Sequence, residues 1–302
     1  MFREKMGSSR ILPLLLFLFV FVTLALLASP WIQAEDNSSN SSEDIPAWVK
    51  RIEFSAQLET DKNPLFYFQT VQPFHQNPDK TDALFIQPRV HVRAGRTTSN
   101  LGIGYRRLAS ENWIWGANLF ADYQDLHRHG RLGLGLEALG QIIEFRANSY
   151  FGGITNKKRI QDSASVNIYE EAVDGVDAEL GFPLPYLPWL KLYGSGLWYD
   201  FKKFDDRTGW KSRLEAKVNE ALRLEFYTWD DNKGEQEYGG RIRINMAFAS
   251  FFDFKDVFRF SSEAFPQKDL KEDVLIPVER SFDVTVEKWQ ETGGLTVEAG
   301  RT

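Results

Sequence analysis

Two neighbouring stretches between residues 112 and 139 alternate apolar and polar side chains with a period of two. In the second stretch Leu132, Leu134 and Leu136 share one face, and arginine, glycine and glutamate occupy the positions between them. Successive side chains of a strand point to opposite faces, so this period predicts two strands rather than helices. The first stretch has aromatic residues, Trp113 and Tyr123, at the two ends of its apolar face. An apolar band with aromatic ends is typical of a barrel wall in lipid.

The same alternation recurs from residue 52 to residue 248. It predicts about twelve strands of about ten residues each, the length with which a tilted strand crosses a bilayer. The expected strands are 52–58, 65–74, 84–92, 101–105, 112–123, 131–139, 143–151, 176–182, 190–198, 214–218, 222–226 and 238–248. With the N-terminus in the periplasm, short connections at 109–112, 139–141, 184–188 and 219–221 would lie on the inner side. The longest connection, 154–173, would then lie outside, which is the asymmetry expected of such barrels.

The direction of the apolar face separates two classes of barrel. A soluble barrel points its apolar residues inward, whereas an outer-membrane barrel points them to lipid and keeps polar residues in the lumen. About twelve strands would enclose a lumen too wide for side chains to fill as a dry core, which favours the membrane class. Aromatic residues expected in the interfacial girdles favour it too: Trp113, Tyr123, Trp189, Trp198, Trp229 and Phe248.

The composition argues against several function classes. The 302 residues carry a formal net charge of -6 and contain no basic run, which argues against a nucleic-acid partner. The absence of cysteine excludes a disulfide framework and a cysteine-ligated metal. After the N-terminal segment, no stretch is apolar enough for a membrane helix.

The first residues have the pattern of an export signal. Arg3, Lys5 and Arg10 form a positive region, residues 11–28 are apolar, and Ala34 is the small residue of a candidate cleavage site. An uncleaved anchor helix is the alternative, because about eighteen apolar residues can just span a bilayer. We expect cleavage, and hence export to the outer membrane of a Gram-negative-type bacterium.

Several runs in the predicted strands carry a family resemblance. They are residues 100–106 (Asn-Leu-Gly-Ile-Gly-Tyr-Arg), 115–123 (Trp-Gly-Ala-Asn-Leu-Phe-Ala-Asp-Tyr), 131–137, 147–151, 175–186 and the motif Pro277, Val278, Glu279 and Arg280. In this order they resemble the translocator barrel of the inverse autotransporters, the intimin/invasin family, over most of residues 45–288. The resemblance implies an all-β fold, a twelve-stranded antiparallel transmembrane outer-membrane β-barrel. It also implies that the C-terminal segment threads back through the lumen, partly helical, to carry a passenger outside.

The resemblance sets the expected organisation and function. We expect a signal peptide at 1–34, a flexible periplasmic N-terminus at 35–48, a transmembrane barrel at 49–249 and a C-terminal linker or lumen plug at 250–302. Family members usually continue into immunoglobulin-like adhesive domains, whereas this sequence stops at Thr302. We therefore expect no adhesive passenger in cis, and a barrel that anchors or exports its C-terminal segment or takes a passenger in trans. The alternative is a passive outer-membrane pore.

The polar faces of the strands supply the candidate site residues. A charge network is expected in the lumen: Arg89, Arg106, Arg131, Glu144, Arg146, Arg213, Glu215, Arg241 and Arg243. It could bind the threaded segment, set ion selectivity, or form a hydrated, paired network that holds the barrel's shape. Tail carboxylates such as Asp269 and Asp273 could meet these arginines. Gly240 and Phe248, in the last strand, are similar to the aromatic-terminated signal that the barrel-assembly machinery reads.

A second alternative is an outer-membrane hydrolase. Asp122, Asp125, His127 and His129 fall close together near an outer loop, where an Asp/His site is conceivable. A solvated loop is the competing interpretation. No serine or cysteine nucleophile motif accompanies them, and a His-x-His pair lacks the third ligand that a metal needs.

We therefore expect no enzyme activity, no catalytic residue, no cofactor and no metal. The expected partners are outer-membrane lipid and lipopolysaccharide, the barrel-assembly machinery and periplasmic chaperones.

Overall fold

A computed structural model of the chain describes residues 46–162, 166–246, 259–292 and 295–298. Residues Ile45–Thr302 make one compact unit. The predicted signal peptide lies outside the described residues, as does Phe248 of the expected assembly signal.

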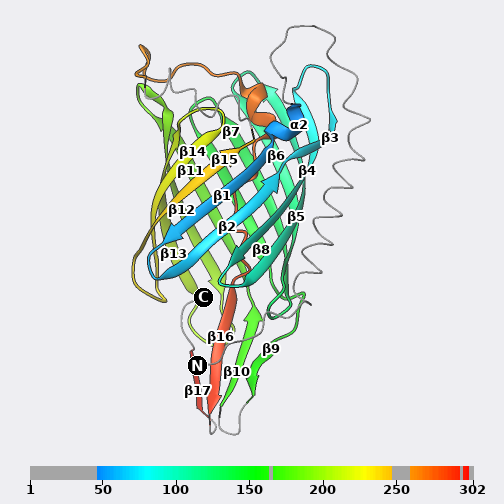
Figure 1. Cartoon of the computed structure of the whole chain (residues 1–302), viewed down its shortest axis with the longest axis vertical. Coiled ribbons are helices and arrows are strands. Elements are labelled where there is room, and N and C mark those ends of the chain that lie inside the picture. The colour runs from blue at the N-terminus through cyan, green and yellow to red at the C-terminus, as the bar shows by residue number, and fades with distance from the viewer. Residues whose placement is uncertain (1–45, 163–165, 247–258, 293–294, 299–302) are drawn as a thin grey trace. The chain divides into compact units, whose positions relative to one another are not determined.

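The unit is a closed antiparallel β-barrel (Figure 1). Its strands are β1 (Ile52–Glu59), β2 (Lys62–Thr70), β3 (Gln72–Gln76), β4 (Asp82–Arg93), β5 (Arg96–Ser110), β6 (Trp113–Gln124), β7 (His129–Gly140), β8 (Glu144–Phe151), β11 (Asp174–Leu184), β12 (Leu187–Asp200), β13 (Arg207–Lys217), β14 (Leu222–Asp231) and β15 (Glu237–Asn245). They occupy twelve positions in the wall, because β2 and β3 follow one another along the same edge of β4. Pairing of β1 with β15 closes the sheet. The predicted twelve-stranded antiparallel barrel is confirmed.

The two ends of the barrel differ in their connections. At the turn end the strands are joined at 111–112, 141–143, 185–186 and 218–221. At the loop end the connections include 125–128, 201–206, 232–236 and the longest, 152–173. Two further turns at the loop end, 60–61 and 94–95, are as short as those at the turn end, so the expected asymmetry rests on 201–206 and above all on 152–173.

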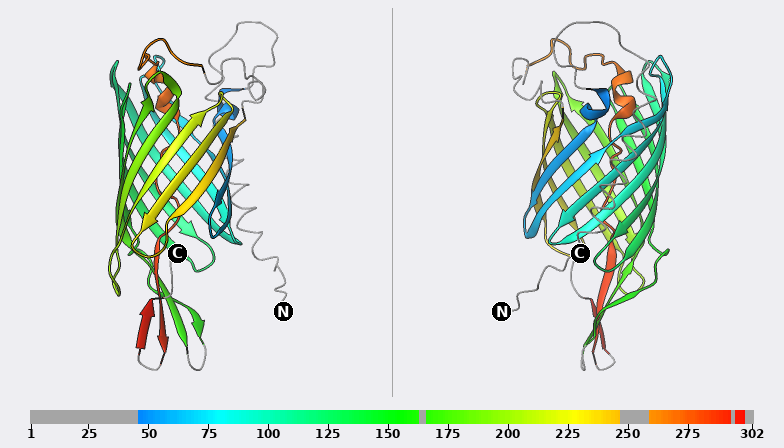
Figure 2. Two further views of the ribbon diagram at one scale, coloured as in Figure 1. Left: turned by 90° about the vertical axis from the view of Figure 1, so that its left-hand side faces the viewer. Right: turned by 45° about the vertical axis from the view of Figure 1, so that its right-hand side comes forward.

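The longest connection is more ordered than the sequence indicated. It contains a hairpin of β9 (Lys158–Asp162) and β10 (Asn167–Ala172). β10 pairs with β16 (Val286–Thr292), which pairs in turn with β17 (Leu295–Glu298). This four-stranded sheet projects from the loop end (Figure 2). The prediction of a loop was wrong here, because the partner of β10 lies far along the chain and local alternation cannot reveal it.

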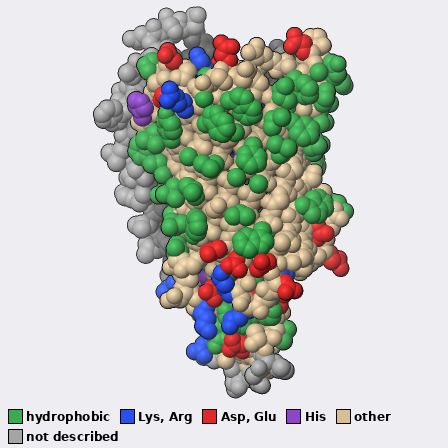
Figure 3. Space-filling model, turned by 180° about the vertical axis from the view of Figure 1, so that it is seen from behind, with side chains coloured by type: hydrophobic (Ala, Val, Ile, Leu, Met, Phe, Trp, Pro, Cys, Tyr) green, Lys and Arg blue, Asp and Glu red, His purple; other side chains and the backbone are tan. Residues whose placement is uncertain are grey.

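The outer surface of the wall is apolar. Leu119 of β6 lies opposite Leu134 of β7, and each side chain is 49% exposed. Polar neighbours on the same strands, such as Asn118 and Asp122, are buried inside. Figure 3 shows apolar side chains covering the wall, while charged side chains gather at its ends. In a membrane barrel this outer face meets acyl chains.

Several of the aromatic residues expected in the interfacial girdles lie on the outer face, but Trp229 does not. Trp113, Tyr123 and Trp198 are exposed on the outer face. Trp229 is 8% exposed, and its Nε1 donates a hydrogen bond of 2.7 Å to Glu59 in the lumen. The reason is strand phase, since Trp229 shares its face of β14 with the buried residue Tyr227.

Two short helices lie at the turn end. α2 (Ala47–Lys50) precedes β1, and η4 (Leu270–Leu275), a 3₁₀ helix, follows the wall strands. In the described ranges, no helix has the length and apolarity needed to cross a membrane.

The outward direction of the apolar face can be tested at mid-strand. Leu134→Arg should lower the free energy of unfolding in phospholipid vesicles by about 2–4 kcal/mol, the cost of an arginine facing lipid near the bilayer midplane. Equilibrium unfolding in urea measures this loss. Leu126→Arg is the matched control, because Leu126 is 40% exposed in a connection at the loop end. Equal effects of the two substitutions would contradict a lipid-facing wall.

Candidate functional site: the lumen and the segment that crosses it

The C-terminal segment, residues 259–285, crosses the lumen from the turn end to the loop end (Figures 1 and 2). At the turn end, the backbone N–H of Tyr186 donates to Ala264, and that of Ser261 donates to Tyr186. At the loop end the segment continues into β16. Contacts between these points fix its path.

The helix η4 packs against the turn end of the wall. Its side chains Leu270 and Val274 are buried against Ile114 and Leu139, which point into the lumen. The Asp269 side chain accepts a hydrogen bond from the N–H of Lys271 and so caps the helix. Asp269 was expected to meet lumen arginines, but its carboxylate serves this cap.

Arg106 holds the segment just after this helix. Its Nη1 donates to the backbone carbonyls of Val274 and Ile276. Its Nε and Nη2 donate to the carboxylate of Glu137 on β7, at 2.9 and 3.1 Å. The guanidinium group thus joins two wall strands to the segment.

Arg280 is the most enclosed charged side chain of the segment. Its guanidinium donates to both oxygens of Asp122, at 3.1 and 2.8 Å. Arg131 donates to the same carboxylate at 2.8 Å. The Asp122 side chain is 0% exposed and that of Arg280 is 1% exposed. A buried carboxylate therefore joins one arginine of the wall to one of the segment, and charge-assisted bonds of this kind are strong.

The wall leaves room for Arg280 at Gly133. A Cβ atom at this position would lie 2.3 Å from Nη2 of Arg280. The Arg280 guanidinium also lies over the ring of Phe120, at 4.4 Å from its centroid. Gly133, one of the alternating glycines of β7, thus leaves space for the Arg280 side chain.

Wall side chains also bind the backbone of the segment. Gln87 accepts from the N–H of Val278 at 2.8 Å, and the Tyr150 hydroxyl accepts from the N–H of Ser281 at 2.9 Å. The carbonyl of Ser281 accepts from Arg131 at 2.7 Å. An extended chain inside a barrel has no neighbouring strand, so its polar backbone groups need such side-chain partners.

Two acidic residues of the segment meet basic residues of the wall. Glu279 accepts from Arg243 at 2.6 Å, and Asp283 lies 2.6 Å from Nε2 of His91. The expected contact between tail carboxylates and lumen arginines therefore occurs, but at Glu279. Asp273 pairs instead with Lys268, at 2.8 Å.

The remaining residues of the expected charge network pair along the wall. Arg146 lies 2.8 Å from Glu144, Arg213 lies 3.0 Å from Glu215, and Arg241 lies 3.2 Å from Glu225. Arg89 donates to Gln69 at 3.1 Å, and its guanidinium lies 4.2 Å from the ring centroid of Phe282 in the segment. Arg89, Arg106, Arg131 and Arg243 thus touch the segment, and Glu144 lies 3.6 Å from Lys268 of the segment. Arg146, Arg213 and Arg241 join wall strands to one another.

The other motif residues lie in different surroundings. Val278 packs with Phe85 and Phe120, which face the lumen. Pro277 directly follows Ile276, the residue that caps η4 at its C-terminus. Gly240 lies in β15, between Leu58 of β1 and Phe226 of β14.

Sequence reasoning missed several residues that hold the segment. Gln87 and Tyr150 are examples, and Asp122 had been grouped with an outer loop. The available signal was apolar residues on the polar face of β6: Ile114 and Phe120 break the alternation and pack against the segment.

The Asp/His site considered as an alternative is not assembled. Asp122 lies with arginines in the lumen, and Asp125 accepts from the N–H of Thr97 at 2.9 Å. His127 and His129 meet Glu170 of β10 instead, at 2.6 and 3.3 Å.

The segment does not fill the lumen completely. A cavity of about 530 Å³ remains beside it, lined by residues 278–285 and by wall residues such as Lys211 and Tyr227. The cavity is polar enough to hold water, so the segment narrows the lumen rather than sealing it dry.

Comparison with known proteins gives a matching family model and curated relatives that match in part. A family model described as the inverse autotransporter β-domain matches residues 33–208. A putative attaching and effacing protein homolog of Escherichia coli strain K12 is 27% identical over 177 residues, which are 57% of this chain and 57% of that protein. An invasin of Yersinia enterocolitica is 30% identical over 106 residues, covering 35% of this chain and 12% of that protein. The chain therefore spans only part of the length of these curated relatives.

A solved structure shares the fold. A chain from a study of the in-meso crystallization of membrane proteins aligns with a TM-score of 0.62 at 16% identity, over 78% of this chain and 99% of that chain. At this identity the likeness concerns the fold alone.

The carboxylate shared by two arginines can be tested by Asp122→Asn. The substitution leaves Arg131 and Arg280 buried without their anion, and breaking a buried ion pair costs about 3–5 kcal/mol. Urea unfolding of the full-length barrel in detergent should show a loss of this size. Asp205→Asn, the same change at an exposed loop carboxylate, should leave stability nearly unaltered. A loss no larger than that of the control would mean that Asp122 does not bind the two arginines.

Proposed function

This chain belongs to the inverse autotransporter β-domain family, and from that premise we propose that its outer-membrane barrel anchors its own C-terminal segment and carries it to the cell exterior. The function is structural rather than catalytic. Export through a cleaved signal peptide and insertion by the barrel-assembly machinery, with periplasmic chaperones and lipopolysaccharide as further contacts, belong to the same proposal.

The observation that carries the proposal is the shared carboxylate of Asp122. It binds Arg131 of the wall and Arg280 of the segment in a fully enclosed setting. In an open pore the arginine of the segment could stay hydrated in the channel. Burying it against the wall would then bring no benefit to the passage of solutes. A fixed ionic contact inside the lumen is what an anchor for a crossing chain requires.

Contacts at both ends of the segment support the same function. Arg106 of the wall binds the segment near the turn end, and Glu287 of β16, the strand that continues the segment, binds the barrel at the loop end. Glu287 accepts hydrogen bonds from the backbone N–H groups of Lys202 and Lys203, each 2.8 Å long, in the connection after β12. A segment fastened at three levels resists being pulled back through the barrel.

The direction of crossing follows from the connections. The segment enters at the end with the short turns and leaves at the end with the longest connection. In outer-membrane barrels short turns are periplasmic and long loops are extracellular. We therefore assign the loop end, with β16 and β17, to the cell exterior.

The hydrolase alternative loses its support. Of the four residues considered for it, Asp122 lies with Arg131 and Arg280 rather than beside His127. The passive pore is the remaining alternative, and a conductance measurement distinguishes it from an anchor.

Conductance separates an anchor from a pore. A chain that ends after Phe248 should conduct several-fold more current in planar bilayers than the full chain, because the segment no longer occupies the lumen. Heat-modifiable mobility in gel electrophoresis should first establish that both barrels are folded. Equal single-channel conductance would show that the segment does not block the lumen.

The direction of crossing can be read from cysteine labelling, because the chain has no cysteine of its own. Thr296→Cys in β17 should react with a membrane-impermeant maleimide on intact cells. Ser262→Cys, at the turn end, should react only after the outer membrane is opened. Both positions are exposed, so they form a matched pair. Labelling of Ser262→Cys but not Thr296→Cys on intact cells would reverse the proposed direction.

A further inference from the structure

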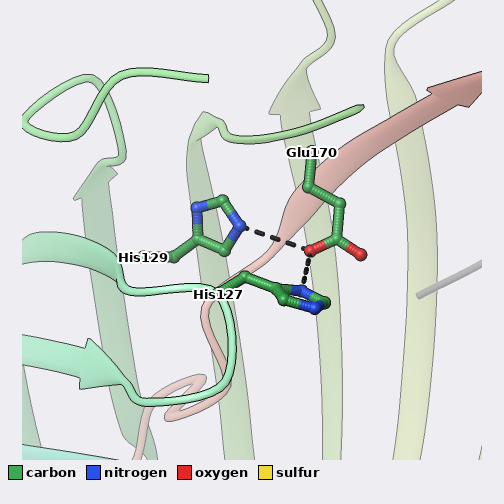
Figure 4. A group of neighbouring side chains, drawn as sticks. All are labelled: His127, His129 and Glu170. Atoms are coloured by element: carbon green, nitrogen blue, oxygen red, sulfur yellow. Dashed lines mark hydrogen bonds and ion pairs between the residues drawn. The ribbon is translucent and has the colours of Figure 1, made fainter. Parts of the chain in front are cut away.

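Three side chains with metal-ligand chemistry converge at the loop end (Figure 4). His127 lies in the connection between β6 and β7, His129 begins β7, and Glu170 belongs to β10. Figure 4 shows both imidazole rings directed at the carboxylate of Glu170. Nδ1 of His127 lies 2.6 Å and Nε2 of His129 lies 3.3 Å from Oε2 of that carboxylate.

The cluster is enclosed, unlike a surface ion pair. The side chains of His129 and Glu170 are 0% and 1% exposed, and that of His127 is 20% exposed. Among the described residues, Oε1 of Glu170 and Nδ1 of His129 have no hydrogen-bond partner. Lys288 is 3.7 Å from Oε1, beyond hydrogen-bond range. A buried carboxylate oxygen without a donor is costly unless something else satisfies it.

We propose that His127, His129 and Glu170 bind one divalent transition-metal ion of the zinc class at the mouth of the barrel. Two imidazole nitrogens and one carboxylate are ligands that such ions prefer. The partly exposed side of His127 leaves a fourth position for water. The site goes beyond the anchoring function and does not depend on it.

The distances are compatible with this coordination once the side chains shift, because the three ligand atoms now span up to 4.8 Å. Bonds of about 2.0–2.1 Å place the ligand atoms of a tetrahedral zinc site about 3.3 Å apart. The separation between His129 and Glu170 is already 3.3 Å, and all three ligand atoms lie within 4.8 Å of one another. The 2.6 Å separation between His127 and Glu170 needs to lengthen by less than 1 Å.

The ion would join the barrel to the sheet that carries the emerging segment. Glu170 lies opposite Lys288 of β16 in the ladder between β10 and β16. His127 lies in the connection between β6 and β7, and His129 is the first residue of β7. A metal bound by all three would fasten β10, and through it β16, to the mouth of the barrel.

Cobalt titration tests the site on the full-length chain in detergent, purified with a tag that contains no histidine. Co²⁺ should bind with a stoichiometry of one and give the visible absorption of a four-coordinate ion, and Zn²⁺ should displace it. Loss of a second-shell partner alone weakens metal sites about 10–100-fold, so Glu170→Gln or His129→Ala should weaken binding by at least that factor.

Two matched controls accompany these variants. Glu171→Gln changes the neighbouring carboxylate of the same strand, and His75→Ala removes an exposed histidine of β3. Both should bind Co²⁺ like the parent, and heat-modifiable mobility should show that every variant is folded.

Two outcomes would overturn the proposal. The first is the absence of one-to-one binding by the parent. The second is undiminished binding by folded Glu170→Gln, which would leave only a weak His-x-His pair. Because the titration requires no export, neither outcome bears on the anchoring function.

Discussion

The backbone polar groups of a wall embedded in lipid must be satisfied within the wall, and this constraint shapes the whole structure. Closure of the sheet between β1 and β15 satisfies the backbone of the wall. The alternating side chains then separate lipid from lumen. The crossing segment introduces a second backbone with no strand beside it, so Gln87, Tyr150 and Arg131 provide its hydrogen bonds.

The fold was predictable because its signal is local. Leu132, Leu134 and Leu136 alternate within one strand, and the same period locates nearly all the wall. One error occurred where a distant partner decides the structure, and another where the phase of a strand was overlooked. The hairpin of β9 and β10 was taken for a loop because its partner β16 is remote in sequence. Trp229 was assigned to the outer face by composition, although the phase of β14 turns it inward.

The site was predictable in kind but not in detail. Period-two alternation places Arg106, Arg131 and Arg243 in the lumen, but it does not say which of them touch the segment. Arg280 and Asp122 lie 158 residues apart in sequence, and no local pattern joins them. The inward-facing ring of Phe120 was a usable sign, because an apolar residue on a polar face needs an apolar neighbour within the lumen. Glu170 likewise completes the histidine cluster only through the unpredicted hairpin.

The central claim is that side chains of the wall hold the segment in the lumen of the folded barrel. Hydrogen–deuterium exchange of the full-length protein in detergent tests it most directly at the backbone amides of Val278 and Ser281, which donate to Gln87 and Tyr150. The account predicts slow exchange at both amides, comparable with that of amides in the wall strands. Exchange at the rate of an unstructured peptide, in a barrel whose strands remain protected, would contradict it.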